Sequence, residues 1–199
     1  MADPSRAQAQ RKRILDAAQT CFAERGFHGA SMAKIAETAQ MSPGLIYRYF
    51  ESKSQIIRSI VELQLEQIAD EINHPKHSHQ SLAEHMFDDF YTRRRRHEDD
   101  RLWMDPGLIM EISAEAARDP VIGVALRRFD ETVQARIEDW LRKPQTQGGL
   151  GIAEADVPAK ALMLRLVIEG LKVRQTRQPD LDPALLRRCL DQLVQPLLG

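Results

Sequence analysis

The segment from Ser31 to Lys53 constrains the fold of this chain more than any other, and its sequence is SMAKIAETAQMSPGLIYRYFESK. The pattern predicts two short helices joined by a tight turn. Ser31 is placed to cap the first helix, and Ser42 is placed to cap the second. Pro43 then occupies the first helical position, where an N–H group would have no intrahelical partner. This layout is typical of a helix-turn-helix, whose second helix enters the major groove of DNA.

Helical periodicity also dominates the rest of the 199-residue sequence, and no stretch shows the alternation of a β-strand. Capping boxes that begin at Ser5, Ser52 and Ser81 predict three helix starts. Asp-Pro pairs predict further helix starts at residues 105–106, 119–120 and 182–183.

Several helix ends are marked as well. Gly26 is placed to end the helix that opens at Ser5, because glycine readily adopts the left-handed conformation of a C-cap. The helix that opens at Ser52 is expected to run to about Asn73, and the last two helices are expected at residues 157–176 and 183–198. The sequence therefore predicts an all-α protein with about nine helices.

Charge is distributed unevenly along the chain, although the net charge is only −1. Residues 1–60 hold nine Lys and Arg against five Asp and Glu, a balance of +4. The remaining residues hold nineteen against twenty-four, a balance of −5. A basic N-terminal part joined to an acidic remainder favours a DNA-binding module carried by a module that does not bind DNA. An imbalance of this size also arises by chance.

The predicted second helix of the helix-turn-helix has one face suited to reading DNA. If residues 43–50 are helical, Ile46 and Phe50 share the inward face and Gly44, Leu45 and Arg48 lie opposite. Arg48 can make a bidentate contact to guanine, and Leu45 can pack against a thymine methyl group. Gly44 lets the backbone approach DNA closely.

Other residues are expected to contact phosphates. Tyr47 and Tyr49 flank the DNA-facing side and can donate their hydroxyls; they cannot both pack inward beside Ile46 and Phe50. The helix starts at Ser31, Ser42 and Lys53 offer positive ends, whereas Lys34 is either a phosphate contact or a solvated lysine. For the Arg11–Arg13 run, a solvated helix start is favoured over a DNA-binding arm. The predicted DNA-binding set is Ser31, Lys34, Ser42, Pro43, Gly44, Leu45, Tyr47, Arg48, Tyr49 and Lys53.

The segment from about Arg11 to Ile57 closely resembles the TetR/AcrR family of bacterial transcriptional regulators. The matching residues are Ile14, Ala17, Ala18, Phe22, Gly26, Ile35, Ala36, Ala39, the run Met41 to Gly44, the run Ile46 to Phe50, Ser52 and Lys53. The chain departs from the family at Ser31, where Thr is usual, and at Gln40, where Gly is usual in the turn. A glutamine with positive φ costs on the order of 1 kcal/mol.

The resemblance implies a helix-turn-helix domain at residues 1–55 and an effector-binding and dimerisation domain at residues 56–199, with the boundary near the start of one long helix. It also implies dimerisation through the last two helices. The sequence agrees, because residues 161–173 are almost all apolar and a leucine stripe follows, although a monomer core would look similar. The predicted interface residues are Leu162, Leu166, Gly170, Leu186, Leu190, Leu193 and Leu197.

A pocket for a small, lipophilic effector is expected from a set rich in methionine and aromatic residues. Ordinary core packing is the competing role for each of them. The predicted lining is Met86, Phe87, Phe90, Tyr91, Trp103, Met104, Leu108, Met110, Phe129 and Met163. The Arg93–Arg96 run favours a solvated helix end over an anion site. The histidines around residue 77 lack the spacing of metal ligands, so no metal or cofactor is expected.

The sequence argues against several other classes. Cys21 and Cys189 form neither a metal motif nor a disulfide framework, which indicates a reduced, cytoplasmic setting. No signal peptide is expected, because the first 13 residues hold no apolar core, and no membrane span is expected, because the longest apolar run is broken by Arg165 and Glu169. No nucleophile–base pair or phosphate loop suggests an enzyme. The leading hypothesis is a homodimeric repressor that an effector releases from a double-stranded DNA operator. An activator with the same DNA-binding part and a helical interaction module without DNA binding are the alternatives.

Overall fold

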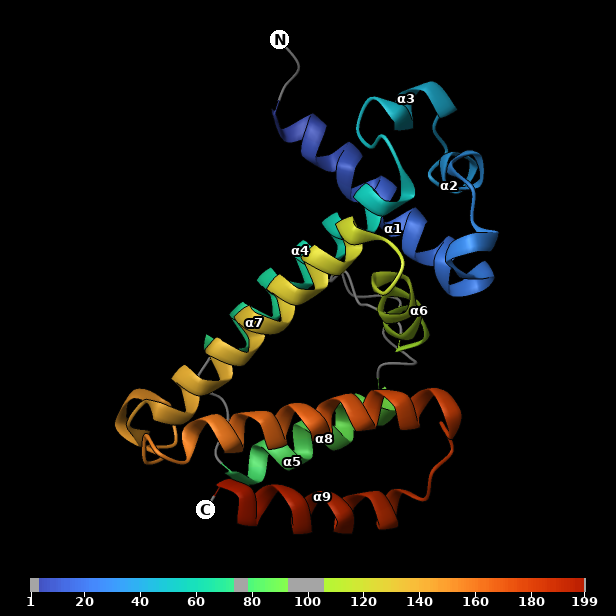
Figure 1. Ribbon diagram of the computed structural model, residues 1–199. Coiled ribbons are helices and arrows are strands. Elements are labelled where there is room, and N and C mark those ends of the chain that lie inside the picture. Colours follow the sequence, from blue (N-terminus) through green and yellow to red (C-terminus); the bar gives the residue numbers. More distant parts are fainter. Residues whose placement is uncertain (1–3, 74–78, 93–105, 199) are drawn as a thin grey trace. The chain divides into compact units, whose positions relative to one another are not determined.

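The computed structural model describes residues 4–73, 79–92 and 106–198 (Figure 1). These residues form nine α-helices and one 3-10 turn, with no strand among them. The elements are α1 (Pro4–Gly29), α2 (Met32–Thr38), α3 (Pro43–Tyr47), α4 (Lys53–Asn73), α5 (His79–Thr92), α6 (Pro106–Ala116), α7 (Pro120–Arg142), η1 (Gln145–Gln147), α8 (Val157–Arg177) and α9 (Pro183–Leu198). The prediction of an all-α protein with about nine helices is confirmed for this part of the chain.

The residues group into two compact units. Residues 1–65 and 102–129 form the first, here named the head unit, and residues 66–101 and 130–199 form the second, the body unit. The head unit thus contains α6 and the start of α7 in addition to the predicted helix-turn-helix. The expected division of the chain at residue 55 concerns function and stays a prediction.

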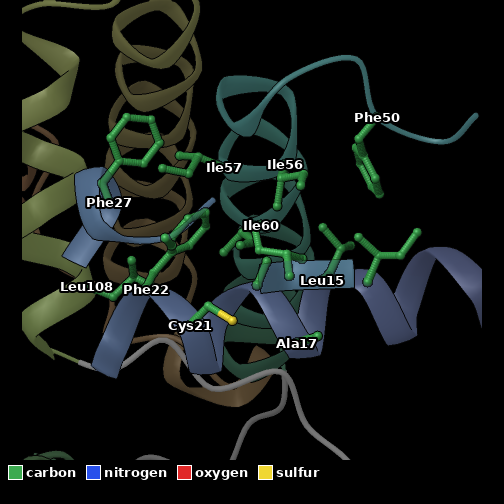
Figure 2. Close-up of a cluster of buried hydrophobic side chains, with 14 of the residues drawn as sticks. Leu15, Ala17, Cys21, Phe22, Phe27, Phe50, Ile56, Ile57, Ile60 and Leu108 are labelled. Carbon is green, nitrogen blue, oxygen red and sulfur yellow. The ribbon is translucent and has the colours of Figure 1, made fainter. Parts of the chain in front are cut away.

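The core of the head unit is built from one face of α1 and from residues that pack onto it. Ile14, Ala18, Cys21 and Phe22 are buried on α1, as their helical spacing predicts. Each isoleucine or phenylalanine so buried contributes roughly 1.5–3 kcal/mol relative to exposure. Figure 2 shows this cluster. It also includes Ile35 of α2, Ile46 of α3, Phe50, Ile56, Ile57 and Ile60 of α4, Leu108 and Ile112 of α6, and Ile122 of α7.

Polar side chains fix several helix starts as predicted. The Ser31 hydroxyl accepts the Lys34 N–H at 3.1 Å, and the Ser52 hydroxyl accepts the Gln55 N–H at 3.2 Å. The Gln55 side chain reaches back to the Glu51 N–H at 2.8 Å and so completes a capping box one residue earlier than expected. Carboxylates of the two described Asp-Pro pairs also accept N–H groups of α7 and α9.

Other boundaries differ from the predictions. Helix α5 begins at His79, so Ser81 lies inside it and is not its N-cap; nothing in residues 79–80 opposes helix, and the capping box does not mark the start. Gly26 is non-helical (φ 72°, ψ 167°) and interrupts α1, so the first helical segment ends there as predicted, and a short helical stretch follows up to Gly29. Helix α3 stops at Tyr47, three residues before Phe50.

In the body unit, α5 packs against both α8 and α9 (Figure 1). Met86 and Phe90 of α5 are buried, as are Leu186, Leu190 and Val194 of α9. Polar contacts add to this apolar core: the Gln175 side chain donates to the Phe90 carbonyl at 2.7 Å, and the Tyr91 hydroxyl donates to the Leu181 carbonyl at 2.5 Å. These bonds hold the C-terminal part of α5 between its two neighbours.

Candidate DNA-binding interface

Helix α3 presents a polar face to solvent and an apolar face to the core. Ile46 and Phe50 are fully buried, whereas Gly44 and Arg48 are exposed and Tyr47 is 54% exposed. Because the buried pair is anchored in the core of the head unit, the exposed side chains have a fixed starting geometry. The predicted inward position of Ile46 and Phe50 and the outward position of Gly44 and Arg48 are confirmed.

Tyr49 and Leu45 are less exposed than the helical wheel predicts. Both are half-buried, and Tyr49 packs against the core of the head unit. The physical reason is that the chain tightens after Tyr47, where the Tyr49 N–H bonds to the Ile46 carbonyl at 2.9 Å. In such i→i+3 geometry side chains three residues apart eclipse each other, so Tyr49 turns towards the side of buried Ile46.

The backbone around α3 is open on its exposed side. A Cβ atom built on Gly44 meets no atom within 4 Å. Ser42 occupies the N-cap position in an extended conformation, but its side chain makes no capping hydrogen bond, and Pro43 follows at the start of the helix. Half-buried Lys34 on α2 forms an ion pair with exposed Glu37 at 3.1 Å. These groups can all be reached by a ligand that approaches α3 from solvent.

The turn between α2 and α3 contains Gln40, which stands where the family usually has glycine. Gln40 has a φ of 52°, the only positive value among the non-glycine residues that the structure describes. Its side-chain oxygen accepts a hydrogen bond from the Arg13 guanidinium at 3.0 Å. The positive φ expected where the family usually has glycine is therefore present.

Arg11 supports the end of α3 from α1. Its guanidinium donates to the Tyr49 carbonyl at 3.4 Å and to the Ser59 hydroxyl at 3.3 Å, and its Cζ atom lies 4.5 Å from the centre of the Phe50 ring. Arg11, Lys12 and Arg13 are exposed, as a solvated helix start predicts, but this supporting arrangement of Arg11 was not expected. Sequence reasoning missed it because the partners lie 38 and 48 residues away.

Lys53 points into the head unit. Its ammonium donates to the Phe27 carbonyl at 2.7 Å and to the Ala30 carbonyl at 2.9 Å, and it lies 4.5 Å from the centre of the Phe27 ring. Burial lowers the pKa of this lysine, while the nearby charge of Glu115 opposes that shift. The ammonium expected to meet phosphate is therefore engaged with backbone carbonyls.

The predicted pocket residues do not gather in one unit. Leu108, Met110 and Phe129 belong to the head unit, where Leu108 is fully buried and Phe129 packs against the same core. Met163 is exposed on α8. The α5 residues Met86, Phe87, Phe90 and Tyr91 lie in the body unit, while Trp103, Met104 and the Arg93–Arg96 run lie outside the described residues. The effector pocket stays a prediction.

The predicted interface residues divide between core and surface. Leu162, Leu166 and Leu193 are 46–60% exposed, and Gly170 is exposed with nothing within 4 Å of a built Cβ. Leu186 and Leu190 disagree with the prediction, because they are buried inside their own unit. On α9 the row 186, 190, 194, 198 faces inward, so the outward row begins one residue earlier at Leu185. Leu197 is half-buried.

Within the head unit, α2 and α3 form a helix-turn-helix whose second helix exposes one face to solvent, and this arrangement defines a DNA-binding transcriptional regulator. Two family models match this chain. One is described as bacterial regulatory proteins, tetR family, and matches residues 14–60; the other is described as BetI-type transcriptional repressor, C-terminal, and matches residues 83–199. The chain therefore belongs to the TetR family, and it is a ligand-responsive DNA-binding regulator and not an enzyme.

Individual relatives agree with this assignment. The chain is 30% identical over 142 residues to the HTH-type transcriptional regulator UidR of Escherichia coli K12, covering 71% of this chain and 69% of UidR. It is 28% identical over 184 residues to the HTH-type transcriptional repressor AcnR of Corynebacterium diphtheriae, covering 92% and 88%. The structure of Salmonella enterica GusR superposes with a TM-score of 0.69 at 27% identity, covering 98% of each chain. Among the described residues, no helix is both long and apolar enough to span a bilayer.

Proposed function

We propose that this chain is a homodimeric repressor that leaves its DNA operator when a small molecule binds to it. The observation that carries the proposal is the exposed face of α3, where Tyr47 and Arg48 project from a helix anchored by buried Ile46 and Phe50. The repressor role is supported by the BetI-type model that matches residues 83–199 and by the similarity to AcnR, which is named a transcriptional repressor.

Each exposed group of α3 has a distinct task in the proposed complex. Arg48 reads guanine through its two-pronged guanidinium, and this contact discriminates bases by roughly 1–3 kcal/mol. Tyr47 donates its hydroxyl to a phosphate, while Gly44 and Pro43 leave room for the backbone to approach the groove wall. Ser31, Ser42 and Lys34 supply further phosphate contacts. Half-buried Leu45 and Tyr49 contribute the edges of their side chains.

Dimerisation is proposed through the outward faces of α8 and α9. Leu162, Met163 and Leu166 on α8 are about half exposed, and so are Leu185 and Leu193 on α9. An apolar stripe of this kind on two adjacent helices suits a four-helix bundle with a second copy, in which Gly170 permits close approach. Two copies are also what a symmetric operator requires, because each supplies one recognition helix to one half-site.

The effector is proposed to be lipophilic and to contact the apolar side chains of α5. Phe87, Phe90 and Tyr91 form an aromatic cluster, with ring centres 4.9–5.1 Å apart around Tyr91. Phe87 and Tyr91 are the half-buried members of this cluster and would supply apolar contact area, whereas Phe90 is buried and the Tyr91 hydroxyl already donates to the Leu181 carbonyl. Mass spectrometry of the purified native protein, followed by titration of the compound found, tests this part of the proposal.

The DNA-binding role is tested by Arg48→Ala on the DNA immediately upstream of the gene. We expect roughly ten- to hundredfold weaker binding, because a bidentate base contact is lost. Arg25→Ala removes the same charge from an exposed position on α1 and serves as the matched control. Unchanged binding by Arg48→Ala would remove this residue from its role. Absence of salt-dependent binding by the wild type would favour a helical interaction module.

Repressor and activator are separated by a reporter placed behind the upstream DNA in a strain that lacks the gene. Expression should rise in that strain if the chain represses transcription, and it should fall if the chain activates. Addition of the effector to the wild-type strain should reproduce the result of the deletion.

A further inference from the structure

The segment of residues 26–30, here named the 26–30 turn, begins at the kink of α1 and leads to α2, so it sets where the helix-turn-helix begins. Gly26 has a φ of 72°, and its carbonyl accepts the Ala30 N–H at 3.1 Å. Ser31, which caps α2 through the Lys34 N–H, follows at once. Any movement of this turn therefore moves the first residue of α2 in the same sense.

Helix α4 holds the turn from one side through Lys53. The ammonium bonds to the carbonyls of Phe27 and Ala30 at 2.7 and 2.9 Å, and it lies over the Phe27 ring. If Lys53 swung out to a DNA phosphate, both carbonyls would lose this donor. A partly buried acceptor without a partner is costly, so the inward position is favoured.

Helix α6 holds the same turn from another side through its carboxylates. Glu111 accepts the Phe27 N–H, and its Oε1 atom lies 2.7 Å from where a Cβ of residue 26 would stand. A larger residue at position 26 would have to displace this carboxylate, and it would also be strained by the φ of 72°. One helical turn further on, buried Glu115 contacts the His28 ring nitrogen at 2.8 Å. Side chains of α6 thus contact residues 26, 27 and 28 in turn.

We propose that Lys53 and Glu111 are positioning residues for DNA binding, which fix the 26–30 turn and through it the helix-turn-helix. Neither side chain touches DNA in this assignment. It replaces the phosphate contact that the sequence suggests for Lys53, and it gives Glu111, which no sequence motif singles out, a part in DNA affinity. The inference rests on DNA binding by α3, as proposed above.

Salt dependence distinguishes a positioning lysine from a phosphate contact. Binding of wild type, Lys53→Met, Lys53→Arg and Lys34→Met to a fluorescent duplex from the upstream region is measured from low to high NaCl, at a temperature where circular dichroism shows each protein folded. Each lost phosphate contact lowers the slope of log affinity against log salt by about 0.9. We expect Lys53→Met to bind roughly tenfold more weakly with an unchanged slope, because two carbonyl bonds are lost and no counterion is released. Lys53→Arg should recover most of the affinity.

Glu111→Ala tests the inference by whether DNA affinity rises or falls. Removing a negative charge from a DNA-binding unit strengthens DNA binding by simple electrostatics. The positioning role predicts the opposite, a loss of several-fold, because the Phe27 N–H loses its acceptor. Glu111→Gln, whose amide oxygen can accept the same N–H, should bind like wild type or more tightly. This pair also decides the matter if Lys53→Met fails to fold.

Three results would overturn the inference: a slope lowered by about one in Lys53→Met, wild-type affinity in folded Lys53→Met, or tighter binding by Glu111→Ala. In each case wild-type binding and the loss in Arg48→Ala would stand, so the proposed function would survive. A wild type that does not bind the duplex would remove both.

Discussion

Gly44→Ala should separate the stability of the fold from its affinity for DNA. Gly44 lies in the first turn of α3 on the exposed side, and a Cβ atom built there meets nothing within 4 Å. The folded protein therefore has room for the methyl group. A duplex that packs its backbone against this position has none.

The two effects have opposite signs. In a helix, alanine is more favourable than glycine by up to about 0.5–1 kcal/mol, since glycine loses more conformational freedom on folding. We therefore expect free energies of unfolding equal to or slightly above those of the wild type. On DNA the methyl group must push the backbone away from the groove, and we expect at least about tenfold weaker binding, which corresponds to ~1.4 kcal/mol.

Urea denaturation gives the first quantity and fluorescence anisotropy with upstream DNA the second. Gly170→Ala gives a comparison, because a Cβ there also meets nothing within the chain and α8 is helical, but Gly170 lies on the proposed dimer face. Its effects on unfolding and on DNA binding would therefore act through the dimer and depend on protein concentration, whereas the effects of Gly44→Ala would not. Wild-type affinity of folded Gly44→Ala for DNA, or a loss of affinity that comes only from unfolding, would contradict the expected close approach of DNA to residue 44.

Other positions give further expectations. Gln40→Gly should raise the free energy of unfolding by up to about 1 kcal/mol, because the left-handed strain outweighs the added freedom of the unfolded chain; a lower urea midpoint would contradict this. Leu166→Glu should shift the protein to monomer in analytical ultracentrifugation, whereas a stable dimer would rule out the proposed face. Ser54→Ala removes the hydrogen bond that lowers the pKa of Asp119 from its usual 3.8. A lowered carboxyl pKa stabilises the fold above the unfolded value, so the loss in this variant should fade as pH falls below about 4, and a pH-independent loss would refute it.

Local features of the fold were accessible from the sequence because their causes are local. Ser31 and Ser52 cap helices through N–H groups three residues ahead, and helical spacing alone places Ile46 and Phe50 on one face. The same logic failed at Ser81, where a correct capping pattern stands inside a helix that starts two residues earlier. A capping motif is compatible with a helix start, but the residues before it decide whether the helix begins there or earlier.

The candidate site was less accessible where its geometry depends on residues far along the chain. The role of Glu111 rests on a partner 84 residues away, and the inward turn of Lys53 rests on carbonyls 26 and 23 residues away. No spacing rule connects such positions. The orientation of Tyr49 was predicted wrongly for a different reason. The prediction used regular α-helical spacing up to Phe50, whereas the chain tightens to i→i+3 hydrogen bonds after Tyr47.

The positive charge of the N-terminal part has a different meaning once these contacts are known. The first 60 residues carry nine Lys and Arg, which suggests a broad electrostatic footprint. Arg11, Arg13 and Lys53, however, donate to groups of the head unit itself, and Lys34 is paired with an acid. Part of the basic charge therefore holds the helix-turn-helix in shape. Because each phosphate contact contributes about 0.9 to the salt slope, the slope per chain should fall well below the number of cations. A slope that approaches this number would mean that these internal bonds open on DNA.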